Sequence, residues 1–246
     1  ILLFFLLISG SAVLFAQTPE GEDAPDVQEL PENPETKKTF ESRDRLVMEF
    51  NWNWLFNTPD SLGLRGQSRG FNIYGYYDFK LGSDRFGFAP GLGIASTSFH
   101  HKSHLNLDTA GNTIIAPIHD FGADTMDIKK NKISLTYIEI PVEFRFRTKP
   151  NSKGDQFKFA VGFKGGYLIN GHTKYRGPDP GVFGANNPAD DNEVKFKRHD
   201  VPNLSKFRYG VTARFGYGVV NVQVFYGLSD IFEKNKGPKG APFEVG

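Results

Sequence analysis

The chain has 246 residues, enough for one domain of ordinary size, and its 29 Lys+Arg against 28 Asp+Glu give a formal net charge of +1. This balance argues against a nucleic-acid-binding protein, which at this length would carry a basic surplus. The sequence contains no cysteine, which excludes disulfides, thiolate metal sites and cysteine nucleophiles. Aromatic residues make up 14% of the chain and glycines number 27, a composition typical of short alternating strands rather than helices.

Two distinct segments precede the patterned part of the chain. Residues 1–16 form an apolar run that is short for a bilayer span and ends in small residues, which predicts a secretory signal peptide cleaved after Ala16. A buried N-terminal helix or anchor is the alternative. Residues 17–43 are rich in proline and acidic residues and cannot bury a core, so we interpret them as a disordered acidic periplasmic tether.

From residue 44 to the end, the sequence predicts a single β-barrel domain over residues 44–246. Apolar and polar residues alternate with a period of two, which is the signature of a strand with one apolar face. Seven such segments follow one another, at residues 45–54, 71–80, 86–94, 138–147, 157–170, 206–217 and 220–228.

The two faces of these segments indicate a membrane barrel. One face is apolar and aromatic, as expected for side chains that contact lipid. We assign to it Phe50, Trp52, Ile138, Ile140, Val142, Phe144, Phe146, Phe159, Phe163, Tyr209, Val222 and Val224. The other face mixes charges of both signs with glycines, as expected for a narrow lumen filled by ion pairs. We assign to it Arg45, Glu49, Asp78, Lys80, Glu139, Glu143, Arg145, Arg147, Lys158, Lys164, Arg208 and Arg214. A soluble β-sandwich or lipocalin-like barrel is the alternative, since its strands alternate too.

The connections between the segments alternate in length. Short turns are predicted near residues 81–84, 149–155 and Gly218, and long loops at about 56–68, 101–131 and 171–205. This alternation is typical of an outer-membrane barrel, with short periplasmic turns, long extracellular loops and a periplasmic N-terminus.

Seven strands are an odd number, whereas bacterial single-chain barrels close with an even number. We therefore expect an all-β, antiparallel up-and-down transmembrane barrel of eight strands, of which seven are visible. Residues 229–246 are interpreted as a fourth extracellular loop, with the eighth strand missing after it. Because the sequence also opens on Ile1 rather than Met, we expect it to be a fragment at both ends.

Three segments resemble a known family: residues 136–150 (TYIEIPVEFRFRTKP), 157–171 (FKFAVGFKGGYLING) and 208–232 (RYGVTARFGYGVVNVQVFYGLSDIF). They are similar to PorT-type outer-membrane β-barrel proteins of Bacteroidota, especially in the strand motif formed by Tyr137, Glu139, Ile140 and Pro141. The resemblance covers residues 44–232 and implies an eight-stranded barrel in the outer membrane. Through the namesake of the family it also implies a link to type IX secretion and gliding.

Histidines are the first candidates for chemistry. All six lie at or in predicted loops, at His100, His101, His104, His119, His172 and His199. A nucleophile needs a base held by a third group in fixed geometry, which a long flexible loop does not supply. We therefore expect no catalytic residue, no cofactor and no resident metal. Weak, adventitious binding of a divalent metal by His100, His101 and His104 is the alternative.

Glu139 and Glu143 share one strand face and could be taken for an acid–base pair. Their neighbours on that face are Arg145 and Arg147. Charges in a narrow interior persist by pairing, so we interpret the two carboxylates as members of a structural ion-pair network.

These patterns predict a non-enzymatic, monomeric barrel in the outer membrane, with membrane lipid around it and no nucleic-acid partner. A PorT-like accessory of type IX secretion or outer-membrane assembly is the first hypothesis. The second is a stand-alone structural or surface-binding barrel that acts through its extracellular loops. The third is a small porin-like channel, although a barrel of about eight strands has room for side chains and little else.

Overall fold

A computed structural model describes residues 46–66, 68–117, 128–178, 193–199 and 201–246. The chain divides into two units, Ile1–Glu41 and Ser42–Gly246, and all described residues belong to the second. The predicted signal peptide, the predicted tether, Arg45 and His119 lie outside the described residues.

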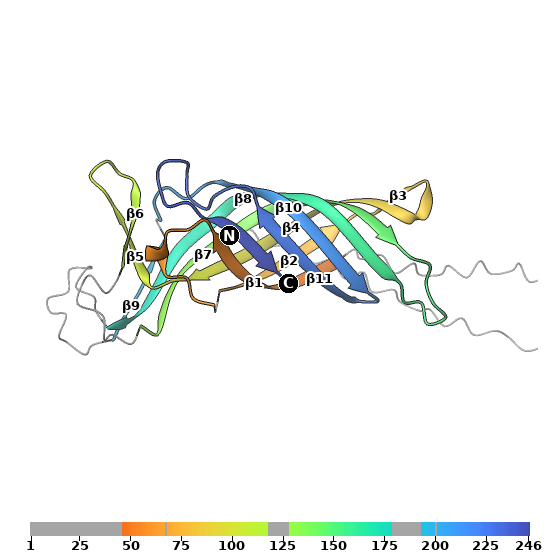
Figure 1. Cartoon of the computed structure of the whole chain (residues 1–246), viewed down its shortest axis with the longest axis horizontal. Coiled ribbons are helices and arrows are strands. Elements are labelled where there is room, and N and C mark those ends of the chain that lie inside the picture. Colours follow the sequence, from red (N-terminus) through yellow and green to blue (C-terminus); the bar gives the residue numbers. More distant parts are fainter. Residues whose placement is uncertain (1–45, 67, 118–127, 179–192, 200) are drawn as a thin grey trace, which may run out of the picture. The chain divides into compact units, whose positions relative to one another are not determined.

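Eight antiparallel strands form a closed hydrogen-bonded ring (Figure 1). In ring order they are β1 (Leu46–Phe56), β2 (Arg69–Tyr76), β4 (Ser83–His100), β7 (Lys130–Arg147), β8 (Phe157–Pro178), β10 (Phe207–Tyr217), β11 (Val220–Gly227) and β12 (Ala241–Val245), which returns to β1. The ring confirms the predicted all-β, up-and-down barrel. Within the described part of the chain, no helix is long and apolar enough to cross a membrane.

Four shorter strands and one helical turn complete the fold. They are β3 (Phe79–Leu81), which pairs with β4; β9 (Glu193–Arg198), which pairs with β8; the hairpin β5 (Ser103–Leu107) and β6 (Thr113–Pro117); and the 3-10 turn η1 (Asp60–Leu62). The connections alternate as predicted. We call the end with the β3–β4, β7–β8 and β10–β11 turns the short-turn end, and the opposite end the long-loop end.

The eighth strand lies inside the sequence, so the interpretation of residues 229–246 as a loop with the strand missing is wrong. β12 pairs with β1 from Trp52–Val245 to Phe56–Ala241, and with β11 from Val224–Val245 to Tyr226–Phe243. The Gly- and Pro-rich stretch before Ala241 made the whole segment resemble a loop. Five residues are also too few for a period of two to stand out.

The period of two places the side chains of each ring strand alternately outside and inside the barrel. β1 and β10 show the simplest pattern, in which every second residue is buried along the whole strand. The exposed positions of β1 are apolar, with Phe50 72% exposed, whereas Glu49, Asn51 and Asn53 are buried. The barrel therefore has an apolar outer wall and a polar interior, the reverse of a soluble core.

Three strands extend well beyond the predicted segments towards the long-loop end. β4 continues to His100, β7 begins at Lys130, and β8 continues to Pro178. The predicted loop at 101–131 also contains the β5–β6 hairpin. In the β7 extension Ile133 and Leu135 face inward and Lys132 and Ser134 alternate with them, so the apolar face changes sides and the pattern that identified the strands within the wall is interrupted.

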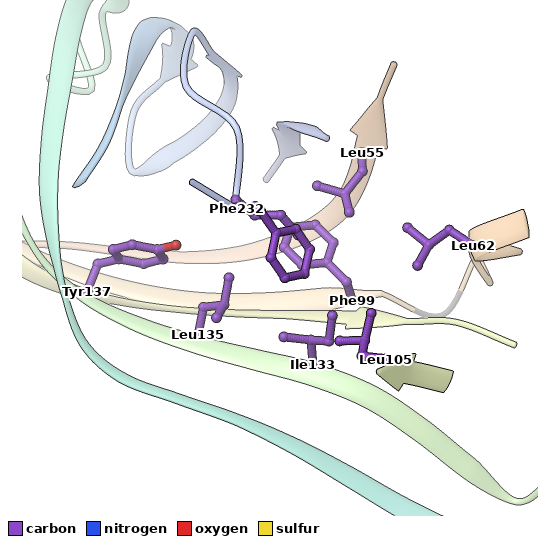
Figure 2. Close-up of a cluster of buried hydrophobic side chains, with 9 residues drawn as sticks. Leu55, Leu62, Phe99, Leu105, Ile133, Leu135, Tyr137 and Phe232 are labelled. Atoms are coloured by element: carbon purple, nitrogen blue, oxygen red, sulfur yellow. The ribbon is translucent and has the colours of Figure 1, made fainter. Parts of the chain in front are cut away.

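The inside of the long-loop end holds an apolar cluster instead of charges (Figure 2). Phe99, Ile133, Leu135 and Tyr137 point inward from β4 and β7, and Phe232 from the β11–β12 connection packs against them. Leu55, Leu62, Leu105 and Ile231 complete the buried set. We call these nine residues the apolar cap.

Candidate functional site

The lumen below the apolar cap is filled by a continuous chain of ion pairs and hydrogen bonds. At the short-turn end, Asp78 pairs with Arg147 and lies 3.5 Å from Nη1 of Arg145. The Nε of Arg145 contacts a carboxylate oxygen of Glu143 at 2.9 Å. Both arginines come from β7, and Asp78 lies two residues after the end of β2, so the pairs reach across the intervening strand β4.

The middle of the network crosses the lumen from β10 to β1. The Nη2 atom of Arg214 lies 2.9 Å from an oxygen of Glu143 and also 2.9 Å from an oxygen of Glu49. Asn72 donates to the second oxygen of Glu49 at 3.0 Å, and Lys164 lies 3.8 Å from that same oxygen. Each of these four buried charges, Glu49, Glu143, Lys164 and Arg214, thus has opposite charges within 4 Å, as burial requires.

A third layer of the network, beyond its short-turn end and its middle, lies directly beneath the apolar cap. Arg208 contacts Glu139 at 2.8 Å and Glu244 at 2.6 Å, and Lys164 lies 3.8 Å from Glu139. Thr97 donates a hydrogen bond of 3.1 Å to Glu244. The exposed fraction is 0% for Glu139 and 1% for Lys164, so water does not reach this layer from either end.

Two tyrosines from β2 bind carboxylates inside the network. The hydroxyl of Tyr74 donates to Glu139 at 2.5 Å and accepts from Lys164 at 2.8 Å. The hydroxyl of Tyr76 donates to Glu143 at 2.9 Å. Their rings need space, which glycine supplies: a Cβ at Gly93 would collide with the ring of Tyr74.

The motif that carried the family resemblance contributes to this site. Tyr137 and Glu139 both point into the lumen because they are two residues apart on β7. The guanidinium of Arg208 lies over the ring of Tyr137, 4.8 Å from its centroid, while it pairs with Glu139. A Cβ at Gly166 would lie 2.8 Å from Cγ of Glu139, so the glycine opposite the motif makes room for the carboxylate.

The structure brings nine of the twelve predicted lumen residues into the ion-pair network: Glu49, Asp78, Glu139, Glu143, Arg145, Arg147, Lys164, Arg208 and Arg214. Lys158 is also buried, beside Arg147 in the register of β7 and β8. Arg45 lies outside the described residues.

Lys80 does not belong to the lumen, so its assignment there is corrected. Its side chain is 48% exposed and pairs with Asp84. It lies in β3, whose three residues are all exposed and whose pairing with β4 shifts register after Lys80. The β3–β4 hairpin projects past the end of the ring, where neither face is enclosed (Figure 1).

Sequence reasoning missed Glu244, Tyr74 and Tyr76. Glu244 lay in the segment interpreted as a loop. The two tyrosines alternate with Asn72 and Asp78 on the polar face of the segment 71–80. Parity thus places them on the lumen side, but the predicted network contains only the charged residues of that face.

The twelve residues assigned to the lipid face lie on the outer wall. Nine of them are exposed: Phe50, Trp52, Ile138, Ile140, Phe144, Phe159, Phe163, Tyr209 and Val222. Val142, Phe146 and Val224 are partly exposed. Cross-strand aromatic pairs strengthen this wall, including Phe50–Phe71 at 5.0 Å and Phe159–Phe215 at 4.9 Å between ring centroids.

The histidines do not form a metal site among the residues that the structure describes, which contain no group of three or more His, Asp or Glu placed to hold an ion. His101 is 2% exposed, and its Nδ1 lies 3.0 Å from the carbonyl of Ser103 and 3.2 Å from its hydroxyl. Asn131 donates to the same carbonyl at 2.7 Å.

This Ser–His–Asn group holds the long-loop end together and does not have the geometry of a nucleophile. The Ser103 hydroxyl is fully buried and donates to the carbonyl of Leu62 at 3.2 Å. Both protein partners approach the same nitrogen of His101, whereas a catalytic histidine uses its two nitrogens for the nucleophile and the orienting group. Burial lowers the pKa of His101 to about 4, so the ring is neutral at pH 7.

The model of a family described as outer membrane protein beta-barrel domain matches residues 40–233. A search of the curated proteins finds no match.

Proposed function

The chain belongs to the outer membrane protein beta-barrel domain family and lies in the outer membrane, and from this premise we propose that it is a closed, non-enzymatic accessory barrel that binds a partner through its long-loop end. In this proposal the apolar outer wall contacts lipid, the long-loop end faces the cell exterior, and the short turns face the periplasm.

The closed lumen is the observation that carries the proposal. Glu139, Lys164 and Tyr74 are buried in the middle of the barrel, and the apolar cap covers them on one side. A pore needs a continuous path for water, and these side chains occupy it. A small channel is therefore the hypothesis that the geometry favours least.

A non-enzymatic role agrees with the two groups that could have suggested chemistry. Glu139 and Glu143 are held by cations and tyrosine hydroxyls. Ser103 is enclosed next to a neutral His101. A substrate would have to displace parts of the fold to reach either group.

An ordered surface at the long-loop end supports a binding role. The β5–β6 hairpin is joined to the β11–β12 connection, because the amide of Thr113 donates to the carbonyl of Lys236 at 2.8 Å. Asn203 adds a hydrogen bond to the carbonyl of Gly111 at 2.9 Å. These contacts position loops from different parts of the chain as one platform.

Type IX secretion or outer-membrane assembly is the partnership we propose for this platform. Its support is the resemblance of residues 136–150, 157–171 and 208–232 to PorT-type barrels. A stand-alone structural or surface-binding barrel is the alternative, and it would use the same platform for a different ligand.

Two measurements test the proposal. The purified full chain in planar bilayers is expected to give no conductance steps, and regular steps would overturn the closed-barrel part. In a deletion strain, loss of many exported proteins with precursors accumulating in the periplasm would support a secretion role. If the secretome is unchanged and no secretion or assembly protein can be crosslinked to the long-loop end, the secretion role is wrong and the stand-alone barrel is the function that remains.

A further inference from the structure

The outer wall near the long-loop end carries six cations in two cross-strand rows. In the first row Lys132 of β7 lies opposite Lys174 of β8, which lies opposite Lys197 of β9. The second row, one step further from the short-turn end, consists of Lys130, Arg176 and Lys195. We call these six residues the basic rows.

The basic rows lie on the outside of the barrel. Ile133 and Tyr175, which alternate with them along β7 and β8, are buried, so the intervening side chains point away from the interior. Lys174 and Lys197 are exposed. Residues 130–136, 170–176 and 195–197 contain no acidic residue.

The height of the basic rows above the apolar wall fits a lipid headgroup region. Along β7 the last apolar outward residue is Ile138, followed by Thr136, Ser134 and then Lys132. A rise of about 3.3 Å per residue and a tilt of about 40° put Lys132 roughly 15 Å beyond Ile138 along the membrane normal. A lysine side chain can reach back towards the membrane from there.

The arrangement concentrates positive charge where the fold alone would avoid it. Like charges directly opposite one another on neighbouring strands destabilise a sheet, and here each row places three together. An anion bound between the strands would relieve this repulsion.

We propose that the basic rows bind the phosphate groups of the glycolipid in the outer leaflet, lipopolysaccharide, and so fix a lipid shell around one side of the barrel. Basic clusters next to a membrane-embedded surface recognise anionic lipid by charge complementarity, and here the surface continues directly into the apolar wall. This inference rests on the proposed orientation of the barrel, in which the long-loop end faces the outer leaflet.

The test compares two double variants of the full chain in nanodiscs of zwitterionic phospholipid that contain labelled lipopolysaccharide in both leaflets. Lys174→Glu/Lys197→Glu reverses two exposed, paired cations of the basic rows. Lys149→Glu/Lys153→Glu makes the same charge change in the exposed β7–β8 turn and is the matched control. Energy transfer from the tryptophans to the label reports lipid binding, and heat-modifiable gel mobility confirms that each barrel is folded.

We expect the Lys174/Lys197 variant to lose at least about tenfold in lipopolysaccharide affinity, and the control and Lys174→Arg/Lys197→Arg to bind like the unchanged chain. Equal binding by both glutamate variants would overturn the proposal. So would equal affinity for dephosphorylated glycolipid, or binding of soluble polyphosphate with no preference for the lipid. Because both leaflets contain the probe, the result does not depend on orientation, which protease digestion of the long-loop end in intact cells tests separately.

Discussion

The Nη1 atom of Arg208 lies 2.6 Å from a carboxylate oxygen of Glu244, and this contact ties the closing strand β12 to β10 across the intervening strand β11. Arg208 also holds Glu139 of β7. One buried guanidinium therefore connects strands from both sides of the ring to the strand that completes it.

Removal of the Glu244 carboxylate is expected to destabilise the barrel. In Glu244→Ala, Arg208 keeps Glu139 and a hydrogen bond of 3.2 Å to the Thr97 hydroxyl but loses its charged hydrogen bond to Glu244 inside the barrel, which costs about 1–3 kcal/mol of unfolding free energy. Urea unfolding in lipid micelles measures the loss. Glu233→Ala is the control, because that exposed carboxylate also contacts a lysine, Lys236, yet its removal should leave the unfolding midpoint unchanged. An equal loss in both variants would contradict the role given to Glu244.

A charge on the outer wall tests whether that wall contacts lipid. Phe144 is 56% exposed on β7. Phe144→Arg is expected to weaken folding into bilayers by about 2–4 kcal/mol, the cost of an arginine near the membrane midplane. Folding into bilayers, followed by the heat-modifiable gel shift, measures this cost. Phe144→Leu should fold normally, and normal folding of the arginine variant would show that this face does not meet lipid.

The apolar cap is expected to stabilise the long-loop end locally. Phe99 is 1% exposed within the cap, so Phe99→Ala should cost about 3–5 kcal/mol through lost burial and an internal cavity. We expect faster protease cleavage in the connections of the long-loop end while the barrel keeps its gel shift. Leu107→Ala, at an exposed position of β5, should leave the cleavage rate unchanged. Equal cleavage rates for the two variants would argue against a stabilising cap.

Because of His101, we expect the stability of the long-loop end to depend on pH. Because burial lowers its pKa from 6.5 to about 4, the unfolded segment binds a proton more readily than the folded one between these values. The contribution of the neutral His101 ring to the stability of the long-loop end is therefore complete above pH 6.5. It declines as the pH falls to 4, by about 3 kcal/mol in total.

Hydrogen exchange of the β5 amides at pH 7 and pH 4.5 measures this effect. In His101→Gln the additional opening at low pH should disappear, whereas His172→Gln, at a partly exposed site, should retain it. An unchanged pH dependence in His101→Gln would assign the effect to another group.

The sequence predicts the barrel wall well because one rule, the alternation of side chains between the two faces of a strand, decides which residues face outward. Glu139 and Ile140 are adjacent, one charged and one apolar, and the period of two sends them to opposite sides of the wall. Exposure of Ile140 and burial of Glu139 follow from that rule. Pairing partners do not follow from it, because Arg208 and Glu139 are 69 residues apart in the chain.

The long-loop end is where sequence reasoning fails. Phe99, Ile133 and Phe232 form one cluster. Around Ile133 the apolar positions of β7 face inward, so the alternation there has the opposite parity to that of the wall, and the connection that carries Phe232 resembles a loop. Lys80 shows the converse error, since parity alone places it inside although the ring has ended by that point. Alternation in the sequence identifies the inward and outward residues only where the strand belongs to the closed ring, which separates the lumen from the outside of the barrel.

Some acids and bases of the network lie on strands that are distant in the sheet before it closes: Glu49 is on β1, but its partners are Lys164 on β8 and Arg214 on β10. While the sheet is still open and flat, these partners are far apart and the polar face must stay in water. Only curling and closure bring them within 4 Å. Insertion of the apolar wall into lipid is thereby coupled to neutralisation of the polar face, so a half-assembled barrel has no stable resting state in the membrane.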